Sequence, residues 1–319
     1  MKLALVFPGQ GSQKVGMGRG WAERSEAARR TFEEADEALG EALSRLCWEG
    51  PEEELALTAN TQPAILATSV AIERALVQDE GFELAPVAVA GHSLGEYTAL
   101  VAAGALPFAD ALRLVRRRGE LMQQAVAPGV GAMAAILALS AEQVAAAVAE
   151  AQSEAETGQV VAVANYNAPG QTVIAGHAAA VERACELAKR RGAKKATMLA
   201  VSAPFHSPLM GPARAGMEPL LAATPLADAR VPVVVNVDAR PVSAAGELRD
   251  ALVRQIDGPV RWVESVTRME RDLGVDGFVE IGPGNALTGM IRRIAESARP
   301  VAVSEPAQVD KLRELVGEG

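Results

Sequence analysis

The sequence predicts an α/β protein with a large domain built on a parallel sheet and a small domain inserted into it. Wholly apolar runs of four to eight residues alternate with amphipathic stretches of helical period, as in a buried parallel sheet covered by helices. In the middle of the chain the predicted order changes to β-α-β-β-α-β over about seventy residues, the split arrangement of ferredoxin-like domains.

The first half of the large domain supplies two predicted strands and several helices. The run LALVF (3–7) is a buried strand closed by turn-forming residues, and VAVA (87–90) is a second one. Helical periodicity covers 20–47, 62–76, 94–103 and 109–126. In 62–76 a single stripe carries the larger apolar side chains, and Pro63 stands in the first turn, where proline is tolerated.

The inserted domain is predicted over 127–199, and the large domain over 1–126 plus 200–319. Strands are expected at 131–139, 159–167, 171–177 and 193–202, with helices at 140–152 and 178–192. Ser140 is a candidate N-cap for the first of these helices. Beyond the insertion, strands are predicted at 231–238 and 277–283, and helices at 246–257 and 285–297.

Composition and charge exclude several classes of protein. The net charge of −9 argues against nucleic-acid binding, which requires clustered cations. Apolar runs fall far short of the roughly 20 residues of a membrane-spanning helix, and the N-terminal run is too short for a secretory signal, so a cytoplasmic protein is expected. Cys47 and Cys185 lie far apart in the sequence and form no metal-ligand spacing, so we expect inert thiols and no metal. A monomer is the default expectation.

A candidate nucleophile stands where the second strand meets a helix. The stretch GHSLG (91–95) has the form G-x-S-x-G, and this strand-to-helix setting is that of a nucleophile elbow. In such a turn the hydroxyl of Ser93 is lifted out of the sheet, and the next backbone N–H, at Leu94, can face a developing oxyanion. The alternative is an ordinary capping serine in a strand–helix turn.

Only three histidines are available as a base for Ser93. His92 precedes the serine on a sharp turn, so its side chain should point elsewhere and serve packing or hydrogen bonding. His177 ends a strand before a helix, where capping or surface exposure is expected. His206 lies in a proline-bounded loop that follows the insertion and can return to the large domain, which makes it the favoured base.

The third member of a hydrolase triad is missing. An α/β-hydrolase carries its acid after a strand and before the histidine. Between Ser93 and His206 the acids considered fall on predicted helices or in a connection, and Asp238 follows a strand but comes after the histidine. A hydrolase triad in the standard order is therefore not supported, while a serine hydrolase or thioesterase stays open as an alternative. An amide or a main-chain carbonyl can orient His206 in place of the acid.

Seven motifs, taken together and in order, resemble the malonyl-CoA:acyl-carrier-protein transacylases of bacterial fatty-acid synthesis. They cover essentially the whole chain and read FPGQGSQ (7–13), TQPAI (61–65), GHSLGEY (91–97), RGELMQ (118–123), ANYNAPGQTVIAG (164–176), APFHSPLM (203–210) and EIGPGNALTGM (280–290). The resemblance implies a hydrolase-like large domain with an inserted ferredoxin-like domain, in agreement with the organisation above.

The resemblance also implies a role for each matching residue. Ser93 matches the acylated nucleophile and His206 its base, while Gln10 and Leu94 match the two backbone oxyanion donors. Arg118 matches the arginine that binds the free carboxylate of malonate, and a guanidinium fork suits that group. Two further positions match the residues that hold the imidazole, a carbonyl of Gln255 and the nearby Asn236.

Selectivity is implied by two side chains. Phe205 resembles the malonyl-selective form of its loop, since methylmalonyl-selective relatives usually carry serine there. Leu94 agrees, because glutamine is common at its position in methylmalonyl sites.

The implied reaction is ping-pong transfer of malonyl from malonyl-CoA to the phosphopantetheine thiol of acyl carrier protein, with no cofactor beyond those carried by the substrates. Because such carrier proteins are acidic, Lys189, Arg190, Lys194 and Lys195, expected beside the inter-domain cleft, are candidates for docking them. A polyketide carrier protein is an alternative acceptor, and a non-catalytic carrier-binding module is disfavoured by the intact Ser93 and His206.

Overall fold

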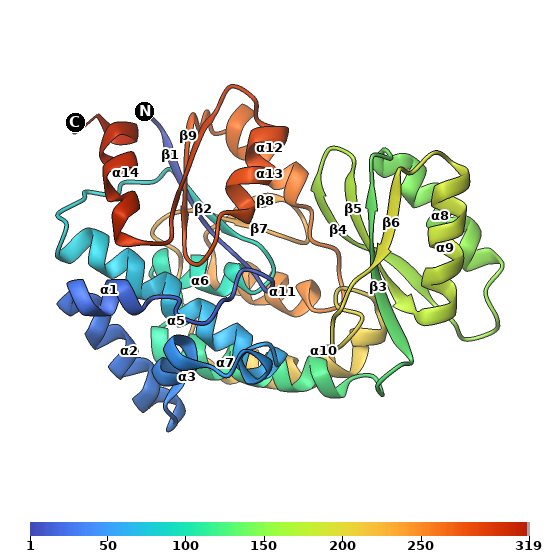
Figure 1. The fold of residues 1–319 in the computed structure, drawn as a ribbon, viewed down its shortest axis with the longest axis horizontal. Helices are drawn as coiled ribbons and strands as arrows, with labels where there is room; N and C mark the ends of the chain where they lie inside the picture. Colours follow the sequence, from blue (N-terminus) through green and yellow to red (C-terminus); the bar gives the residue numbers. More distant parts are fainter. Residues whose placement is uncertain (318–319) are drawn as a thin grey trace.

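The computed structural model describes residues 1–317, which form two sheets with helices packed around them (Figure 1). The larger sheet has six strands in the order β10-β9-β1-β2-β7-β8. Five of them run parallel, and β8 pairs antiparallel with β7. The strands are β1 (Leu3–Phe7), β2 (Ala88–Gly91), β7 (Val233–Val235), β8 (Arg240–Val242), β9 (Gly277–Ile281) and β10 (Arg299–Val303).

Both faces of the larger sheet are buried, which explains why its strands are apolar throughout. Along β1, Leu3, Leu5 and Phe7 enter one core cluster, while Ala4 and Val6 enter another on the opposite face. The helices around this sheet are α1 (Arg19–Arg24), α2 (Glu26–Leu39), α3 (Leu43–Glu49), α4 (Glu52–Leu55), α5 (Thr58–Gln78), α6 (Gly95–Ala102), α7 (Phe108–Gln124), α10 (Gly211–Ala223), α11 (Ala245–Gln255), α12 (Trp262–Arg271), α13 (Ala286–Ile294) and α14 (Val309–Val316), with short 3₁₀ turns η1 (Pro208–Met210) and η2 (Pro306–Gln308).

The smaller sheet is antiparallel and has the order β4-β5-β3-β6. Its elements follow the predicted sequence: β3 (Gly131–Leu137), α8 (Ala141–Ser153), β4 (Val161–Ala168), β5 (Gln171–His177), α9 (Ala178–Arg190) and β6 (Lys195–Met198). Both helices cover the face that points away from the larger sheet (Figure 1). Ser140 caps α8 as predicted, by accepting a hydrogen bond from the Gln143 N–H. The domain boundaries themselves stay a prediction.

One strand of the smaller sheet also contacts the large domain directly. The Tyr166 N–H donates to the Val260 carbonyl at 2.9 Å, and the Val260 N–H donates to the Ala164 carbonyl at 2.8 Å. These bonds extend β4 by one parallel bridge to the segment that follows α11. The smaller sheet is therefore joined to the large domain by backbone hydrogen bonds.

Three predicted elements differ from the observed ones. Helix α5 begins at Thr58 rather than 62, so Pro63 lies inside it rather than in its first turn. Strand β6 ends at Met198, and 199–202 continues as irregular chain. The predicted strand 231–238 is confirmed only over Val233–Val235, because the chain reverses at 236–239, where Ala239 adopts a left-handed φ of 51°, and the strand that follows the reversal, β8, is not among the predicted strands.

Two predictions from composition can be compared with the structure. Cys47 and Cys185 are both buried and unbridged, and burial raises the pKa of their thiols to about 12 and about 11. No helix within residues 1–317 is long and apolar enough to cross a bilayer.

Candidate active site

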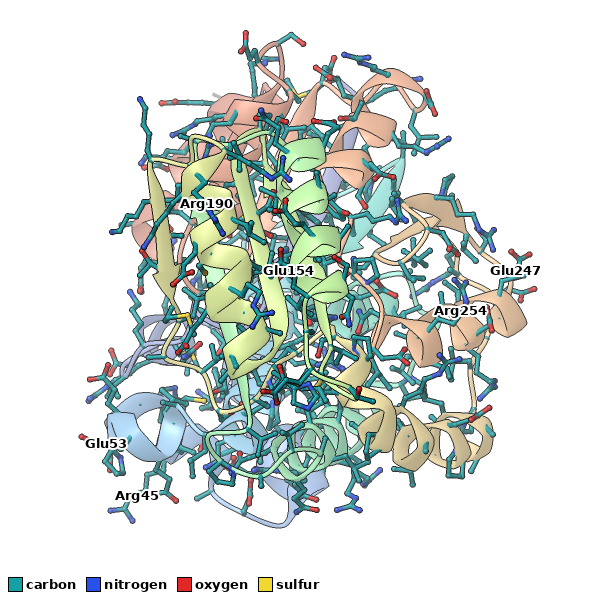
Figure 2. The ribbon with its side chains drawn as sticks, turned by 90° about the vertical axis from the view of Figure 1, so that its right-hand side faces the viewer. Arg45, Glu53, Glu154, Arg190, Glu247 and Arg254 are labelled. Carbon is teal, nitrogen blue, oxygen red and sulfur yellow. The ribbon has the colours of Figure 1, made fainter. Side chains whose placement is uncertain are left out.

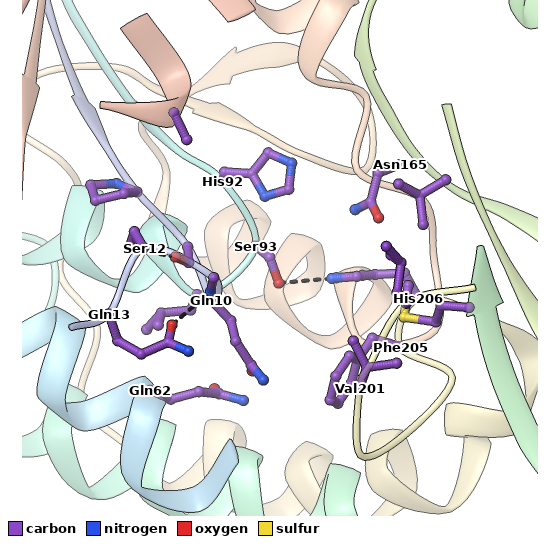
Figure 3. Close-up of a pocket in the computed structure, with 18 of the residues that line it drawn as sticks. Gln10, Ser12, Gln13, Gln62, His92, Ser93, Asn165, Val201, Phe205 and His206 are labelled. Atoms are coloured by element: carbon purple, nitrogen blue, oxygen red, sulfur yellow. Dashed lines mark hydrogen bonds between the residues drawn. The ribbon is translucent and has the colours of Figure 1, made fainter. Parts of the chain in front are cut away.

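A cavity of about 470 Å³ lies between the two sheets, where β1 and β2 end. Ligand sites of open α/β sheets occur at this carboxyl edge. Six of the predicted site residues line the cavity, and Figure 3 shows several of them facing one another. They are Gln10, Ser93, Leu94, Arg118, Phe205 and His206.

Ser93 stands on a strained turn between β2 and α6. Its φ of 52° is left-handed, a conformation that costs a non-glycine residue about 1–3 kcal/mol and must be held by its surroundings. The flanking glycines serve close approach instead. A Cβ on Gly91 would lie 1.9 Å from the Gly95 carbonyl carbon, and one on Gly95 would lie 2.1 Å from the Phe7 carbonyl oxygen. The motif therefore brings α6 against both strands.

Ser93 and His206 form a hydrogen-bonded pair. Their Oγ and Nε2 atoms are 2.7 Å apart (Figure 3). The Nδ1 atom of the same ring lies 2.9 Å from the Gln255 carbonyl oxygen and 3.1 Å from that of Gly258. Because both carbonyls only accept hydrogen bonds, Nδ1 carries the hydrogen and Nε2 is left as the acceptor for the Ser93 hydroxyl.

The surroundings of His206 keep its ring neutral. Burial and the nearby positive charge of Arg118 together lower the pKa of His206 from 6.5 to about 3, against the opposite effect of the two carbonyls at Nδ1. A neutral imidazole with a free Nε2 is the form that accepts a proton from a serine. The pair is thus set up for general-base chemistry without a carboxylate.

Gln255 and Asn236 act at different places. The Gln255 carbonyl holds the imidazole, as the resemblance implied, and its Nε2 donates to the Ser93 carbonyl at 2.8 Å. The expectation that Asn236 also holds the imidazole is wrong. Its Oδ1 accepts from the Ser93 N–H and its Nδ2 donates to the Gly91 carbonyl, both at 2.7 Å. Because β7 ends beside β2, this amide reaches the turn rather than the ring.

Arg118 is a buried guanidinium on α7, only 1% exposed. One terminal nitrogen, Nη1, donates to Gln62 Oε1 at 2.8 Å, and the other, Nη2, to Gln255 Oε1 at 2.8 Å and to Ser93 Oγ at 3.1 Å. Burial lowers its pKa from the ordinary arginine value.

Arg118 has no carboxylate partner within residues 1–317, and its Nε donates to nothing there. Its neighbours in the sequence differ, since Arg116 pairs with Glu41 and Arg117 with Glu120. A buried cation that is hydrogen-bonded only to neutral groups suits an anionic ligand beside Ser93.

The two predicted oxyanion donors flank the nucleophile in the cavity lining. Gln10 follows β1, Leu94 follows Ser93, and both strands end at the same edge of the sheet. Neither backbone N–H has a hydrogen-bond partner in the described part of the chain. An unpaired N–H at such an edge is available to a ligand oxygen.

The other histidines lie outside the reacting pair. His92 is turned away from His206, with its Nε2 2.8 Å from Asn167 Oδ1 and its ring near Trp262, which fits the predicted hydrogen-bonding role. His177 is neither a side-chain cap nor simply exposed. Its Nδ1 accepts from the Val160 N–H at 2.9 Å and so ties the ends of two small-domain strands together.

Sequence reasoning missed two polar residues beside the nucleophile. Gln62 stood within the TQPAI motif, but its contact with Arg118 depends on the crossing of α5 and α7. Glu96 was omitted from the acids considered after Ser93, although an acid in a helix of otherwise small and apolar residues is itself a sign of a buried carboxyl.

The four predicted docking cations do not gather at the cleft. Lys189 and Arg190 lie in the last turn of α9, on the outer side of the smaller sheet, where Figure 2 shows Arg190 facing outward. Lys195 begins β6 in register with Leu137. Its neighbour Ala196 packs on the core beneath the helices, so Lys195 points to the opposite, cleft-facing side. The expectation is therefore wrong for Lys189 and Arg190.

Comparison with known proteins agrees with this geometry. The acyl transferase domain family matches residues 4–312. The malonyl CoA-acyl carrier protein transacylase of Bacillus subtilis is 47% identical over 309 residues, covering 97% of this chain and 95% of that protein. The crystal structure of an acyl carrier protein S-malonyltransferase from Vibrio cholerae has a TM-score of 0.93 at 47% identity, covering 98% of this chain and 100% of its own.

A third relative was solved with a partner. It is a malonyl-transacylase in complex with its type II polyketide acyl-carrier protein, with a TM-score of 0.94 and 46% identity over 99% of this chain and 100% of its own. Sequence identity this high along nearly the whole chain indicates a common family as well as a common fold. The chain belongs to the acyl transferase family, among the malonyl CoA-acyl carrier protein transacylases.

Proposed function

We propose that this acyltransferase moves a malonyl group from malonyl-CoA to the phosphopantetheine thiol of acyl carrier protein, through an ester on Ser93, and so supplies fatty-acid elongation. The observation that carries the proposal is the position of Arg118, whose unpaired guanidinium lies 3.1 Å from the Ser93 hydroxyl. An acyl group attached to that oxygen reaches the guanidinium only if it is short, and the cation favours one that ends in a carboxylate.

In the first half of the reaction, His206 Nε2 takes the proton of the Ser93 hydroxyl while Oγ attacks the thioester carbonyl of malonyl-CoA. The oxyanion that forms accepts hydrogen bonds from the Gln10 and Leu94 N–H groups. The C–S bond then breaks, and His206 returns its proton to the leaving sulfur of coenzyme A. Carbonyls of Gln255 and Gly258 stabilise the imidazolium through Nδ1–H.

In the second half, the thiol of the carrier protein's phosphopantetheine arm enters. His206 takes the thiol proton, the sulfur attacks the ester carbonyl, and Ser93 leaves with the proton returned by the imidazole. The carboxylate of malonate stays on Arg118 through both halves. Phe205 and Leu94 line the space next to the acyl group and disfavour a branched malonyl.

The proposal is tested by mass measurement of the intact protein after incubation with labelled malonyl-CoA. The expected result is one malonyl adduct on Ser93 that is absent in Ser93→Ala and is discharged by holo acyl carrier protein. An unmodified wild-type protein, or an adduct that persists in Ser93→Ala, would contradict it. A thioesterase is the second candidate, since the missing acid alone does not decide the acceptor.

The identity of the carrier protein is a separate question. One relative was solved with a type II polyketide carrier, so a polyketide carrier is an alternative acceptor for this chain. Parallel assays with a fatty-acid carrier and a polyketide carrier, at equal concentration, distinguish the two. A higher kcat/KM with the fatty-acid carrier is expected.

Docking of the acidic carrier is assigned to Lys194 and Lys195. Lys195 lies four residues before Leu199, which lines the cavity, and neither lysine forms an ion pair in residues 1–317. Reversing both charges should lower kcat/KM for the carrier protein and weaken its salt dependence. The matched control reverses Lys189 and Arg190 on the outer side of α9. Equal effects of the two double variants would contradict the assignment.

Three further statements belong to this proposal. The reaction needs no resident metal or cofactor, because the malonyl group arrives as a thioester of coenzyme A and leaves as a thioester of the carrier protein. The chain is proposed to work as a cytoplasmic monomer. The strand order β4-β5-β3-β6 and the elbow after β2 support naming the small domain ferredoxin-like and the large one hydrolase-like.

A further inference from the structure

The nucleophile turn is held by a side chain rather than by its sheet. The chain leaves β2 at Gly91, and β7, its neighbour, ends at Val235, so the parallel ladder stops before the turn. Beyond this point the carboxamide of Asn236 supplies the hydrogen bonds. It donates to the Gly91 carbonyl and accepts from the Ser93 N–H, each at 2.7 Å. A single buried amide thus spans the strained residue.

Asn236 is itself fixed by Glu96. The Asn236 backbone N–H donates to Glu96 Oε2 at 2.7 Å, and the Glu96 N–H donates to the Ser93 carbonyl at 3.0 Å. These contacts close a ring that runs from Ser93 through Asn236 to Glu96 and back to Ser93. Glu96 belongs to the first turn of α6, the helix that the elbow feeds.

We propose that Glu96 is a positioning residue for Ser93, which acts through Asn236 to hold the nucleophile in its left-handed conformation and its Oγ in line with His206. The proposal rests on the proposed function. It gives a role to a carboxyl that is 1% exposed and does not line the cavity.

Burial of Glu96 is otherwise hard to explain. Its second oxygen, Oε1, has no hydrogen-bond partner in the described residues, and burying a carboxyl with an unpaired oxygen is costly. Burial raises the pKa of Glu96 to about 7, although the Asn236 N–H, the Gln255 side chain and the charge of Arg118 act to lower it; the charge of Asp238 raises it. A proton on Oε1 leaves Oε2 free to accept from Asn236, so the contact survives in either protonation state.

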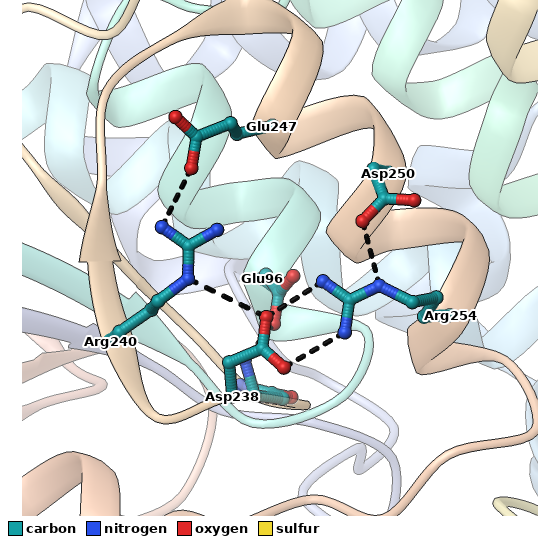
Figure 4. A network of polar contacts seen from close by, with 7 residues as sticks. Glu96, Asp238, Arg240, Glu247, Asp250 and Arg254 are labelled. Carbon is teal, nitrogen blue, oxygen red and sulfur yellow. Dashed lines mark hydrogen bonds and ion pairs between the residues drawn. The ribbon is translucent and has the colours of Figure 1, made fainter.

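A second network stabilises the other side of the site. Asp238, two residues after Asn236, accepts from Arg254 at 2.8 and 2.7 Å, and Arg254 and Arg240 bind further carboxylates around it (Figure 4). Arg254 precedes Gln255, whose carbonyl holds His206. The ion pairs therefore fix the segment that orients the base, whereas Glu96, drawn between Arg240 and Arg254 in Figure 4, fixes the segment that orients the nucleophile.

The test compares Glu96→Ala, which removes the acceptor, with Glu96→Gln, which keeps one. We measure the first-order rate constant of Ser93 acylation at saturating malonyl-CoA by rapid quench and intact mass, together with the half-saturating concentration. Loss of such a supporting contact costs about 10- to 100-fold in rate. In Glu96→Ala the acylation rate constant should fall by this factor. The half-saturating concentration should change less than about threefold, because Arg118 is untouched. Glu96→Gln should recover most of the rate.

Two controls separate positioning from stability. Thr31→Val removes a buried hydroxyl on α2 that bonds the Ala27 carbonyl, far from the elbow, and should acylate at the wild-type rate despite its lower melting temperature. If Glu96→Ala does not fold, Glu96→Met fills similar volume without an acceptor and carries the same expectation. Glu96→Ala acylating at the wild-type rate, or Glu96→Gln as slow as Glu96→Ala, overturns the proposal.

A fluorophosphonate reagent provides an independent readout. It reacts with a serine activated by its base but makes no use of Arg118, so its rate should fall in Glu96→Ala in parallel with acylation. A wild-type protein that reacts with the reagent but not with malonyl-CoA would contradict the proposed function alone. Equal reagent rates in wild type and Glu96→Ala would contradict the role of Glu96 alone.

Discussion

The guanidinium of Arg118 and the hydroxyl of Ser93 are in direct contact, with Nη2 3.1 Å from Oγ. The same oxygen lies 2.7 Å from His206 Nε2. The nucleophile therefore stands between its base and a cation that lacks a carboxylate partner in residues 1–317. On the proposed function, Arg118 selects the substrate and His206 takes the proton at this same oxygen atom, and the predictions below follow from this contact and its surroundings.

Arg118→Ala should remove the preference for malonyl. The change deletes two charge-assisted hydrogen bonds to the substrate carboxylate, each worth about 1.5–3 kcal/mol, so kcat/KM for acylation by malonyl-CoA should fall about 10²- to 10⁴-fold. Acylation by acetyl-CoA should change less than about tenfold. Arg117→Ala, which loses only a surface pair with Glu120, is the matched control and should keep both rates. A persistent malonyl preference in Arg118→Ala would overturn the assignment.

His206 should remain an effective base in mildly acidic solution. Burial and the charge of Arg118 lower the pKa of His206 from 6.5 to about 3, so the ring is neutral throughout the usual range. The kcat/KM for malonyl-CoA, which reports the free enzyme, should stay level between pH 8 and pH 5. At saturating malonyl-CoA the malonyl carboxylate offsets the charge of Arg118, so the apparent pKa of His206 should rise. A free-enzyme profile that falls with a midpoint near 6.5 would show that the ring is solvated.

Glu96 should make stability depend on pH. Burial raises the pKa of Glu96 from 4.5 to about 7, so the folded state binds the proton more tightly than the unfolded chain. This favourable contribution is complete below pH 4.5 and is lost as the pH rises through 7. Glu96→Gln does not titrate, so its free energy of unfolding relative to wild type should rise by at most about 3 kcal/mol from pH 4.5 to pH 8. Urea unfolding of both proteins at several pH values measures this gap, and a constant gap contradicts the prediction.

Phe205→Ser should widen the acyl specificity. Phe205 lines the cavity and packs against both the main core and the small-domain cluster facing it, so its removal opens space beside the acyl group. A methyl group accommodated in such a space is worth about 1–3 kcal/mol, so the ratio of malonyl to methylmalonyl acylation should fall at least about tenfold. Competition between the two thioesters, read by intact mass, gives this ratio directly. An unchanged ratio would place the selectivity elsewhere.

The apolar pattern of the sequence predicts much of the fold, because the burial of apolar side chains determines where the strands and helices form. Strands β1 and β2 are apolar on both faces, and the small domain alternates elements in the predicted order. The sequence pattern does not predict the reversal between β7 and β8. The reversal depends on a left-handed φ at Ala239, and no glycine is present there to mark it. Boundaries such as the start of α5 depend on tertiary packing rather than on local propensity.

The candidate site likewise contains residues that the sequence predicts and residues whose role only the structure shows. Ser93 and His206 follow from motif and elimination, because few residue types perform their chemistry. Asn236 is different, since an amide at a strand end can reach either the imidazole or the turn, and only the register of β2 with β7 decides between them. Glu96 lies three residues after Ser93, yet its role requires knowing that it faces the Asn236 backbone.

The central claim, that Ser93 hands its acyl group to a thiol rather than to water, is tested by following the decay of isolated malonyl-enzyme. The fraction acylated is measured by intact mass over time, in buffer alone and after addition of holo acyl carrier protein. The account predicts an ester that is stable in buffer and is discharged rapidly by the carrier thiol, with the malonyl group recovered on the carrier. Rapid discharge in buffer, at a rate that the carrier does not change, would show a hydrolase and contradict the account.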